Sequence, residues 1–301
     1  MRQSRRLRWA AIPIAAVTAL VLAGCTTEQL NGYLPGFVAG QPNVTSKAGM
    51  VSSLWVNSWI VLLLVGIVVW GLIIWCVVVY RRRKGQTGLP VQLRYNMPIE
   101  IFYTIVPLVL VLGFFAYTAK AQDAIERPWA SPDETILVEG KQWSFDFQYT
   151  KENVYDVGIQ AQADTSSGAL PGAVVESALP TLYLPVNKKI TIELESRDVI
   201  HSFWVPAFLY KKDLIPGHPN YMYVEPTRIG TYEGKCAELC GEYHSAMLFQ
   251  VKVVSGADYT AYLTSLKNKG YTGTLDNTYN RTATDPGTGA EASTSDNGGQ
   301  G

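Results

Sequence analysis

Two long runs without charged side chains stand out along the chain, followed by many short alternating runs. Residues 51–80 and 101–119 contain no charged residue. Thirty helical residues span roughly 45 Å, which exceeds the about 30 Å of bilayer hydrocarbon. We therefore predict transmembrane helices at 51–80 and 98–119. Four basic residues occupy 81–84, and basic loops mark the cytoplasmic side, so the loop 81–97 is predicted to be cytoplasmic and both chain ends to lie outside.

Beyond residue 120 the pattern is typical of strands rather than helices. Alternating or β-rich runs are separated by Gly, Pro and Asn, and occupy 135–149, 181–185, 189–195, 201–205, 221–224, 229–236 and 247–254. Such spacing predicts an all-β domain at 120–269, an antiparallel sandwich or barrel closed by a helix at 258–267. Small and polar residues dominate 155–180, which we expect to be a long loop or insertion. The almost entirely polar segment 270–301 is predicted to be a disordered tail.

The N-terminus has the pattern of an export signal. A basic start precedes an apolar run at 9–23 and small residues before Cys25, which predicts a signal peptide at 1–24. The sequence Leu-Ala-Gly-Cys also resembles a bacterial lipobox, which predicts lipidation of Cys25 and an extracytoplasmic segment at 25–50. The alternative is an ordinary cleaved signal or an uncleaved anchor, in which Cys25 has no special chemistry. Cys76, within the first span, reads as a small apolar helix residue without a role.

Composition supports a partly membrane-embedded chain. Hydrophobic residues make up 48% and charged residues 17%, against roughly 25% charged in soluble proteins. The formal net charge of zero gives no reason to expect a nucleic-acid partner. Residues 120–301, however, contain 15 basic and 23 acidic residues, a net charge of −8. This exported part would attract a cationic partner, unless the charges only keep it solvated. Four cysteines and three histidines suffice for one metal site.

The densest group of metal-ligand side chains lies at 236–247. Cys236, Cys240, His244 and Met247 follow a Cys-x3-Cys-x3-His-x2-Met spacing. Soft sulfur ligands with imidazole suit copper or zinc, and a weak Met ligand favours a copper electron-transfer centre. Two thiolates would bridge two coppers, and a second histidine would come from His201 at a strand edge or from His218 in a turn. The alternative reading of Cys-x3-Cys in an oxidising compartment is a disulfide.

The order of these motifs over roughly 51–267 resembles subunit II of haem-copper cytochrome c oxidases. The resemblance implies a cupredoxin-like Greek-key barrel with a binuclear copper centre, Cu-A. In the family pattern Cys236 and Cys240 would be the bridging thiolates, and His201 and His244 the terminal imidazole ligands. Met247 and the backbone carbonyl of Glu238 would be the axial ligands. The Glu238 side chain would bind Mg or Mn shared with subunit I. Asp198 fits the family's acidic-x-x-His pattern and would organise that interface, unless it is a solvated strand-end acid.

Two further family motifs occur with departures. Gly140-Lys-Gln-Trp143 resembles the segment whose Trp receives the electron from cytochrome c, although Ser144-Phe145 replaces the usual Tyr-Trp. Trp143 would otherwise be a core aromatic. Glu100 matches an acid that marks the cytoplasmic mouth of a proton path in subunit I, but could instead be a hydrated helix-end charge. Residues 211–217 also match a family segment near subunit I, and the residues alone give them no chemistry.

The resemblance predicts an electron-input subunit in a bacterial plasma membrane. A c-type cytochrome or cytochrome bc complex would reduce Cu-A, which would pass electrons to haem a of subunit I for proton-pumping reduction of oxygen to water. Haem would reside only in partner subunits, because the chain lacks a Cys-x2-Cys-His motif. Two alternatives are a copper-free quinol oxidase subunit II that acts as a scaffold, and a membrane-anchored copper-binding lipoprotein or chaperone.

Overall fold

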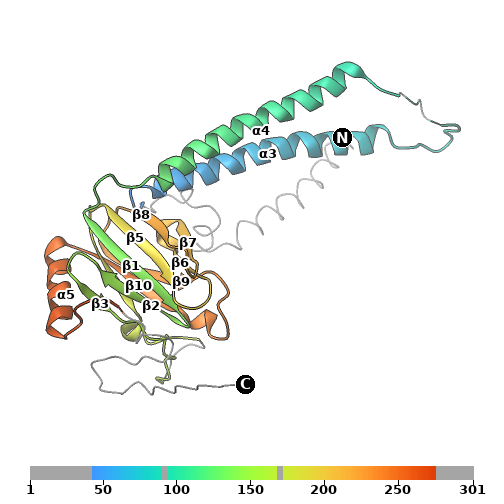
Figure 1. Ribbon diagram of the computed structural model, residues 1–301. Helices are drawn as coiled ribbons and strands as arrows, with labels where there is room; N and C mark the ends of the chain where they lie inside the picture. Colours follow the sequence, from blue (N-terminus) through green and yellow to red (C-terminus); the bar gives the residue numbers. More distant parts are fainter. Residues whose placement is uncertain (1–42, 90–91, 93, 168–171, 276–301) are drawn as a thin grey trace, which may run out of the picture. The chain divides into compact units, whose positions relative to one another are not determined.

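Two long apolar helices form one unit of the computed structural model (Figure 1). Helix α3 spans Ala48–Val79 and α4 spans Met97–Glu126. Both are long and apolar enough to cross a membrane. Most of their large apolar side chains are not covered by other parts of this chain. The Asn57 amide donates a hydrogen bond of 2.8 Å to the Tyr117 hydroxyl and links the two helices. Helix α3 begins three residues before the predicted span and ends at Val79. Helix α4 continues past residue 119 through charged residues to Glu126, because backbone hydrogen bonding does not require apolar side chains.

The structure describes residues 43–89, 92, 94–167 and 172–275. The predicted signal at 1–24, the Cys25 lipidation site and residues 276–301 of the predicted tail lie outside them. The described residues 52–119 belong to the helical unit, and residues 43–51 and 120–275 form the second unit.

Two mixed five-stranded sheets make up the second unit. The first has the order β3-β2-β1-β5-β8, with strands Val154–Asp156, Ser144–Tyr149, Glu134–Lys141, Ile190–Ser196 and Asn220–Val224. The second has the order β4-β10-β9-β6-β7, with strands Thr181–Pro185, Leu248–Val254, Gly230–Cys236, His201–Val205 and Tyr210–Leu214. The β1–β5 and β4–β10 pairs are parallel, so the purely antiparallel prediction was wrong. Chain crossings between the sheets, as from β4 to β5, produce these parallel neighbours.

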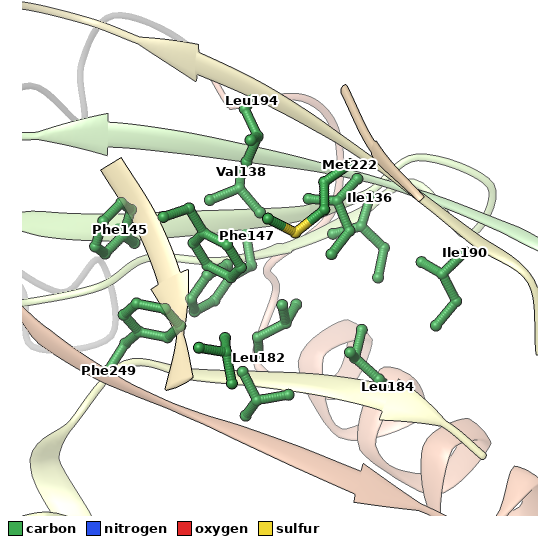
Figure 2. Close-up of a cluster of buried hydrophobic side chains, with 14 of the residues drawn as sticks. Ile136, Val138, Phe145, Phe147, Leu182, Leu184, Ile190, Leu194, Met222 and Phe249 are labelled. Carbon is green, nitrogen blue, oxygen red and sulfur yellow. The ribbon is translucent and has the colours of Figure 1, made fainter. Parts of the chain in front are cut away.

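The hydrophobic core lies between the inner faces of the two sheets. Ile136 and Val138 of β1 and Phe249 of β10 are almost completely buried, and Figure 2 shows them meeting in one cluster. Burying one such side chain stabilises the fold by roughly 1.5–3 kcal/mol. Helix α5, Gly256–Asn268, begins at Ser255, whose hydroxyl accepts a hydrogen bond from the Asp258 N–H. Its buried side chains complete the core at one end.

The start of the segment 155–180 is hydrogen-bonded to β2. The Gly158 N–H donates to Asp146 Oδ1 at 2.8 Å, and the Ser144 hydroxyl donates to the Ile159 carbonyl at 3.0 Å. Since β2 side chains alternate, Asp146 lies on the face opposite the core, yet it is completely buried. The start of this segment therefore covers the outer face of β2.

Residues 43–47 join the β unit before α3 begins. Thr45 forms a β-bridge with Pro226, and the Lys47 ammonium donates to the carbonyls of Ile125 at 2.7 Å and Arg127 at 3.2 Å. The same ammonium lies 4.5 Å from the centroid of the Trp129 ring. Lys47 thus holds the chain before α3 against the end of α4.

Candidate metal centre

The predicted ligands come from two neighbouring strands and the loop after one of them. His201 is the first residue of β6 and Cys236 the last residue of β9. These strands are antiparallel neighbours, with Phe203 opposite Cys236. The Cys236 N–H donates to the Met247 carbonyl at 3.0 Å and closes the loop between β9 and β10. A histidine distant in sequence is thereby brought to the cysteine-containing loop.

The two cysteine sulfurs lie close together without a disulfide. Their Sγ atoms are 3.9 Å apart and both thiols are free and buried, whereas a disulfide would require about 2.05 Å. Two sulfurs that each bind the same metal at about 2.3 Å can be separated by this distance. Among the described residues, His201, Cys236 and Cys240 form a buried cluster whose ligand atoms all lie within 4.8 Å of one another.

The remaining predicted ligands surround this cluster. His244 Nδ1 is 3.5 Å and Met247 Sδ 3.7 Å from Cys240 Sγ. The Glu238 carbonyl oxygen is 3.2 Å from Cys236 Sγ, while the Glu238 side chain is exposed. One compact site therefore contains two thiols, two imidazoles, a thioether and a carbonyl.

His201 is oriented with one ring nitrogen toward the sulfurs and the other toward an acid. Its Nδ1 is 3.9 Å from Cys236 Sγ, and its Nε2 lies 2.7 Å from Asp198 Oδ1. A carboxylate on the far nitrogen is the usual arrangement around a metal-binding histidine. Asp198 therefore acts on His201 directly. His218 is exposed in a turn with Ile215 and is not part of the cluster.

The two thiols differ in acidity. Burial raises the pKa of Cys236, but contacts with His201 and nearby backbone groups outweigh it and leave that pKa below its ordinary value. Burial and the neighbouring Cys236 raise the pKa of Cys240. Burial also raises the pKa of Asp198, yet hydrogen bonds from His201 and backbone N–H groups leave it lowered. Cys236 is therefore the more acidic of the two thiols, and a bound metal cation would supply the positive charge that favours loss of the Cys240 proton.

The Gly140-Lys-Gln-Trp motif reaches the same site. The Gln142 amide donates to the Cys240 carbonyl at 2.7 Å, and the Trp143 indole N–H donates to that carbonyl at 3.3 Å. The Gln142 backbone N–H donates to Asp198 Oδ2 at 2.7 Å. Gly241 has a φ of +124°, and a Cβ there would lie 3.2 Å from the Trp143 ring. Sequence reasoning did not identify Gln142 or Gly241, although Gln142 stands in the recognised motif.

An open cavity of about 640 Å³ borders the site on another side. Cys236 and His244 line it, together with Trp204, Lys211 and Lys235. Lys235 lies with its ammonium 4.7 Å from the centroid of the Trp204 ring. The cavity therefore combines aromatic and cationic side chains next to two predicted ligands.

Glu100 lies in the other unit, in the first turn of α4. Its carboxylate accepts a hydrogen bond of 2.9 Å from the Asn96 N–H. This contact caps the start of the helix.

The donor set fits copper better than zinc. Thiolates, imidazoles and a thioether are soft or borderline ligands that copper centres use, whereas structural zinc sites take four strong ligands and have no use for methionine. The two free sulfurs at 3.9 Å are compatible with a shared metal and exclude the disulfide reading for this conformation.

Comparisons with known proteins identify the family of the chain. The sequence profile of the family described as cytochrome c oxidase subunit II, periplasmic domain, matches residues 134–254. A probable cytochrome c oxidase subunit 2 of Streptomyces avermitilis is 43% identical over 288 residues, covering 86% of this chain and 88% of the relative. The chain belongs to the cytochrome c oxidase subunit II family. Cytochrome c oxidase subunit 2 of Mycobacterium tuberculosis is 31% identical over 287 residues, covering 81% and 78% of the two chains.

A solved structure also resembles this subunit II chain. The periplasmic domain of subunit II of the Bradyrhizobium japonicum cytochrome oxidase (CoxB) is 29% identical, covers 46% of this chain and 96% of its own, and gives a TM-score of 0.39. The predictions of the family, of two apolar helices followed by a β domain, and of an oxidase subunit are confirmed. This subunit II is membrane-anchored with an extracytoplasmic β domain, and His201, Cys236 and Cys240 form its candidate copper-binding site.

Proposed function

We propose that this subunit II carries a binuclear copper centre and is the electron input of its oxidase. Electrons would come from a c-type cytochrome or a cytochrome bc complex and pass to haem a of subunit I, where oxygen is reduced to water and protons are pumped. One observation carries the proposal: two free cysteine sulfurs lie 3.9 Å apart, with His201, His244 and Met247 within 4 Å of one or the other.

Each residue has a distinct part in holding the centre. The thiolates of Cys236 and Cys240 and the imidazoles of His201 and His244 would hold the copper pair, and the Met247 thioether and the Glu238 carbonyl would be weaker ligands. When bound, the copper pair supplies a one-electron acceptor and donor whose charge is shared by two metals. The protein keeps the ligands fixed, because His201 and Cys236 lie in paired strands and Asp198 orients the imidazole. A rigid ligand set limits the reorganisation that accompanies each transfer.

Trp143 is the proposed contact for the donor. It is half-buried, so part of the indole remains available to a partner. Its N–H donates to the Cys240 carbonyl, which supports a short path from the ring to a bridging ligand.

Four finer assignments belong to the same proposal. The exposed carboxylate of Glu238 would bind Mg or Mn at the contact with subunit I. The cavity beside Cys236 is lined also by Lys211, which belongs to segment 211–217, the segment that matches a family segment near subunit I. This supports the cavity side of the domain as the side that faces subunit I. Glu100 would stand at the mouth of a proton path, and Cys25 would carry lipid, which mass analysis of the mature N-terminus tests.

Copper content and electron paramagnetic resonance (EPR) of the purified oxidase test the proposal. We expect two coppers per subunit II and a spectrum in which both share one unpaired electron. Cys240→Ser should abolish the shared-spin spectrum, because it removes a bridging sulfur, whereas Met247→Leu should mainly shift the reduction potential. Cys76→Ser, in α3, is the control and should change neither.

Other outcomes favour the alternatives. A preparation that contains no copper would support a quinol oxidase scaffold. Zinc or one isolated copper would support a metal-binding lipoprotein. An unchanged spectrum in Cys240→Ser would remove this cysteine from the ligand set.

A further inference from the structure

Trp143 has an aromatic partner that the sequence motifs did not single out. The rings of Trp143 and Tyr243 are packed edge to face, with centroids 4.9 Å apart and an angle of 75° between their planes. Tyr243 is 43% exposed and stands in the ligand loop between Cys240 and His244. The pair thus combines a ring from the Gly140-Lys-Gln-Trp motif with one from the ligand loop.

Strand β2, which begins directly after Trp143, offers no exposed ring. The position directly after Trp143 is Ser144, which is buried and donates to the Ile159 carbonyl. The next, Phe145, is fully buried and packs against Phe203 and Phe249. The residues that stand where the family usually has Tyr-Trp therefore offer no aromatic surface beside Trp143. Tyr243, from the ligand loop, packs against the indole instead.

We propose that Tyr243 and Trp143 together form the surface on which the haem edge of the electron donor docks. This inference rests on the proposed function and deepens it by naming a second contact residue. Both rings lead directly to predicted copper ligands. The Trp143 N–H donates to the Cys240 carbonyl at 3.3 Å, and Tyr243 precedes His244, whose Nδ1 is 3.5 Å from Cys240 Sγ.

The surroundings of the two rings fit a c-type haem domain with a cationic rim. Leu239, adjacent to Cys240, is 78% exposed, so the same loop also carries an exposed apolar side chain. The loop segment 236–247 carries no basic residue, and Glu242, directly before Tyr243, is exposed. An apolar centre with an acidic neighbour, on a domain whose net charge is −8, complements an exposed haem edge surrounded by Lys or Arg.

The step is a simple electron transfer. One electron leaves the ferrous haem iron of the donor, which becomes ferric, and is accepted by the oxidised copper pair. No bond forms or breaks, no proton moves, and neither ring is itself oxidised. The rings shorten the gap that the electron crosses, and they hold the donor at that distance.

Rapid-mixing kinetics of the intact oxidase with a reduced soluble c-type cytochrome test the inference. Tyr243→Ala should lower the second-order rate of copper reduction about tenfold, the size expected for a central aromatic contact. Tyr243→Phe keeps the ring and should retain the wild-type rate. Tyr221→Ala, a tyrosine of similar exposure on β8 (39%), is the matched control and should also retain it.

Two readouts separate docking from a structural effect. The copper EPR spectrum and the reduction rate with ascorbate and a small redox mediator should be unchanged in Tyr243→Ala, because neither depends on a protein partner. A wild-type rate with the cytochrome in Tyr243→Ala, together with a slow rate in Trp143→Ala, would overturn the inference and leave the proposed function intact.

The remaining outcomes are equally decisive. Loss of the copper spectrum in both Tyr243→Ala and Tyr243→Leu would assign the ring to loop stability and overturn the docking role. Wild-type rates in both Tyr243→Ala and Trp143→Ala would refute electron input at this surface altogether. Absence of a binuclear copper signal in the wild-type oxidase would refute the proposed function itself.

Discussion

At the scale of single residues, a glycine determines where the His201 ring can lie. A Cβ on Gly140 would be 2.9 Å from His201 Cδ2 and 3.1 Å from Leu214 Cδ2. Asp198 contacts the neighbouring ring atom, Nε2, so Gly140 and Asp198 together fix this side of the imidazole. The glycine of the Gly140-Lys-Gln-Trp motif thus leaves the space that the His201 ring of the predicted metal centre occupies.

Gly140→Ala is expected to displace the His201 ring and weaken copper binding. The added methyl group must move either the imidazole or Leu214, and the buried site offers little relaxation. We expect a lower copper-to-protein ratio and an altered EPR spectrum. Gly256→Ala, where a Cβ would meet nothing within 4 Å, is the control, and identical spectra in the two variants would contradict this account.

A buried carboxyl on β2 gives the domain a pH dependence of its own. Asp146 is completely buried and forms a 2.9 Å ion pair with Lys141, and its Oδ2 has no hydrogen-bond partner among the described residues. Burial raises the pKa of Asp146 to about 6, against an ordinary value of 3.8, although Lys141 and the Gly158 N–H oppose this shift. Between these two values the folded chain binds more protons than the unfolded chain, so Asp146 lowers stability as pH rises.

Asp146→Asn should remove that dependence. The Tm of the wild-type protein minus that of the variant should fall as pH increases from about 4 to 6, and level off above. Asp164→Asn is a contrasting control, because hydrogen bonds from Ser166 lower the pKa of Asp164 below its ordinary value of 3.8. This carboxyl is therefore ionised in both the folded and the unfolded chain over most of this range, and the Tm difference for Asp164→Asn should stay nearly flat. A Tm difference between wild type and Asp146→Asn that is constant over this range would contradict the prediction.

At the scale of elements, the β9–β10 pair depends on a small residue facing a large one. Gly234 lies directly opposite Phe249 in the antiparallel register, and a Cβ there would be 2.2 Å from the Phe249 ring. Phe249 also stacks on Phe203 at 4.6 Å between ring centroids. Its ring therefore lies over the backbone of Gly234, on the strand that ends at Cys236.

Gly234→Ala should destabilise the domain by roughly 1–3 kcal/mol, as overpacking of a filled core does. The ring of Phe249 has to shift against Phe145 and Phe203, which are both fully buried. Thermal unfolding of the purified protein measures the effect, with Gly256→Ala at the start of α5 as the control. An unchanged Tm in Gly234→Ala would contradict the prediction and show that the Phe249 ring can move aside without loss of stability.

At the scale of the whole molecule, charge is distributed unevenly along the chain. The basic cluster at 81–84 follows α3, whereas residues 120–301 have a net charge of −8. Positive charge beside a membrane span orients the chain, and negative charge on an exported domain steers a cationic partner toward it. The basic cluster thus concerns the orientation of the chain in the membrane, and the acidic domain concerns the approach of a partner.

The second-order rate of copper reduction by a cationic cytochrome should fall steeply as ionic strength rises. Screening shortens the reach of the acidic domain to about 8 Å at 0.15 M salt, so steering weakens. Rapid mixing over a salt series measures the slope, with a neutral small-molecule reductant as the control. A flat salt response would mean that the acidic residues only solvate the domain.

Local patterns were enough to predict the elements with strong periodicity. Charge-free runs predicted α3 and α4, and alternating runs predicted most strands. Strands β3 and β7 were missed because short edge strands have little pattern: in β7, Tyr210–Leu214, only the last residue is buried. The parallel β1–β5 and β4–β10 pairs were also missed, since side-chain alternation reports a strand's two faces but not the direction of its neighbours.

The site divides in the same way between local and long-range information. The spacing of Cys236, Cys240, His244 and Met247 identified a copper-type ligand loop by itself, because ligands within twelve residues need no knowledge of the fold. The choice between His201 and His218 could not be made from residue types alone. It follows from the pairing of β6 with β9, which brings one histidine to the sulfurs and leaves the other in an exposed turn.

The amino-acid sequence alone determined the two apolar helices, the β-rich exported domain and the chemical type of the ligand set. These depend on hydrophobicity, alternation and short spacings, which act locally. Only the tertiary structure decided that Asp198 and Gln142 brace the site, that Phe145 is buried and that Tyr243 packs on Trp143. Gln142 and Cys240 are 98 positions apart, and such contacts arise from how the sheets pack, which no local pattern encodes.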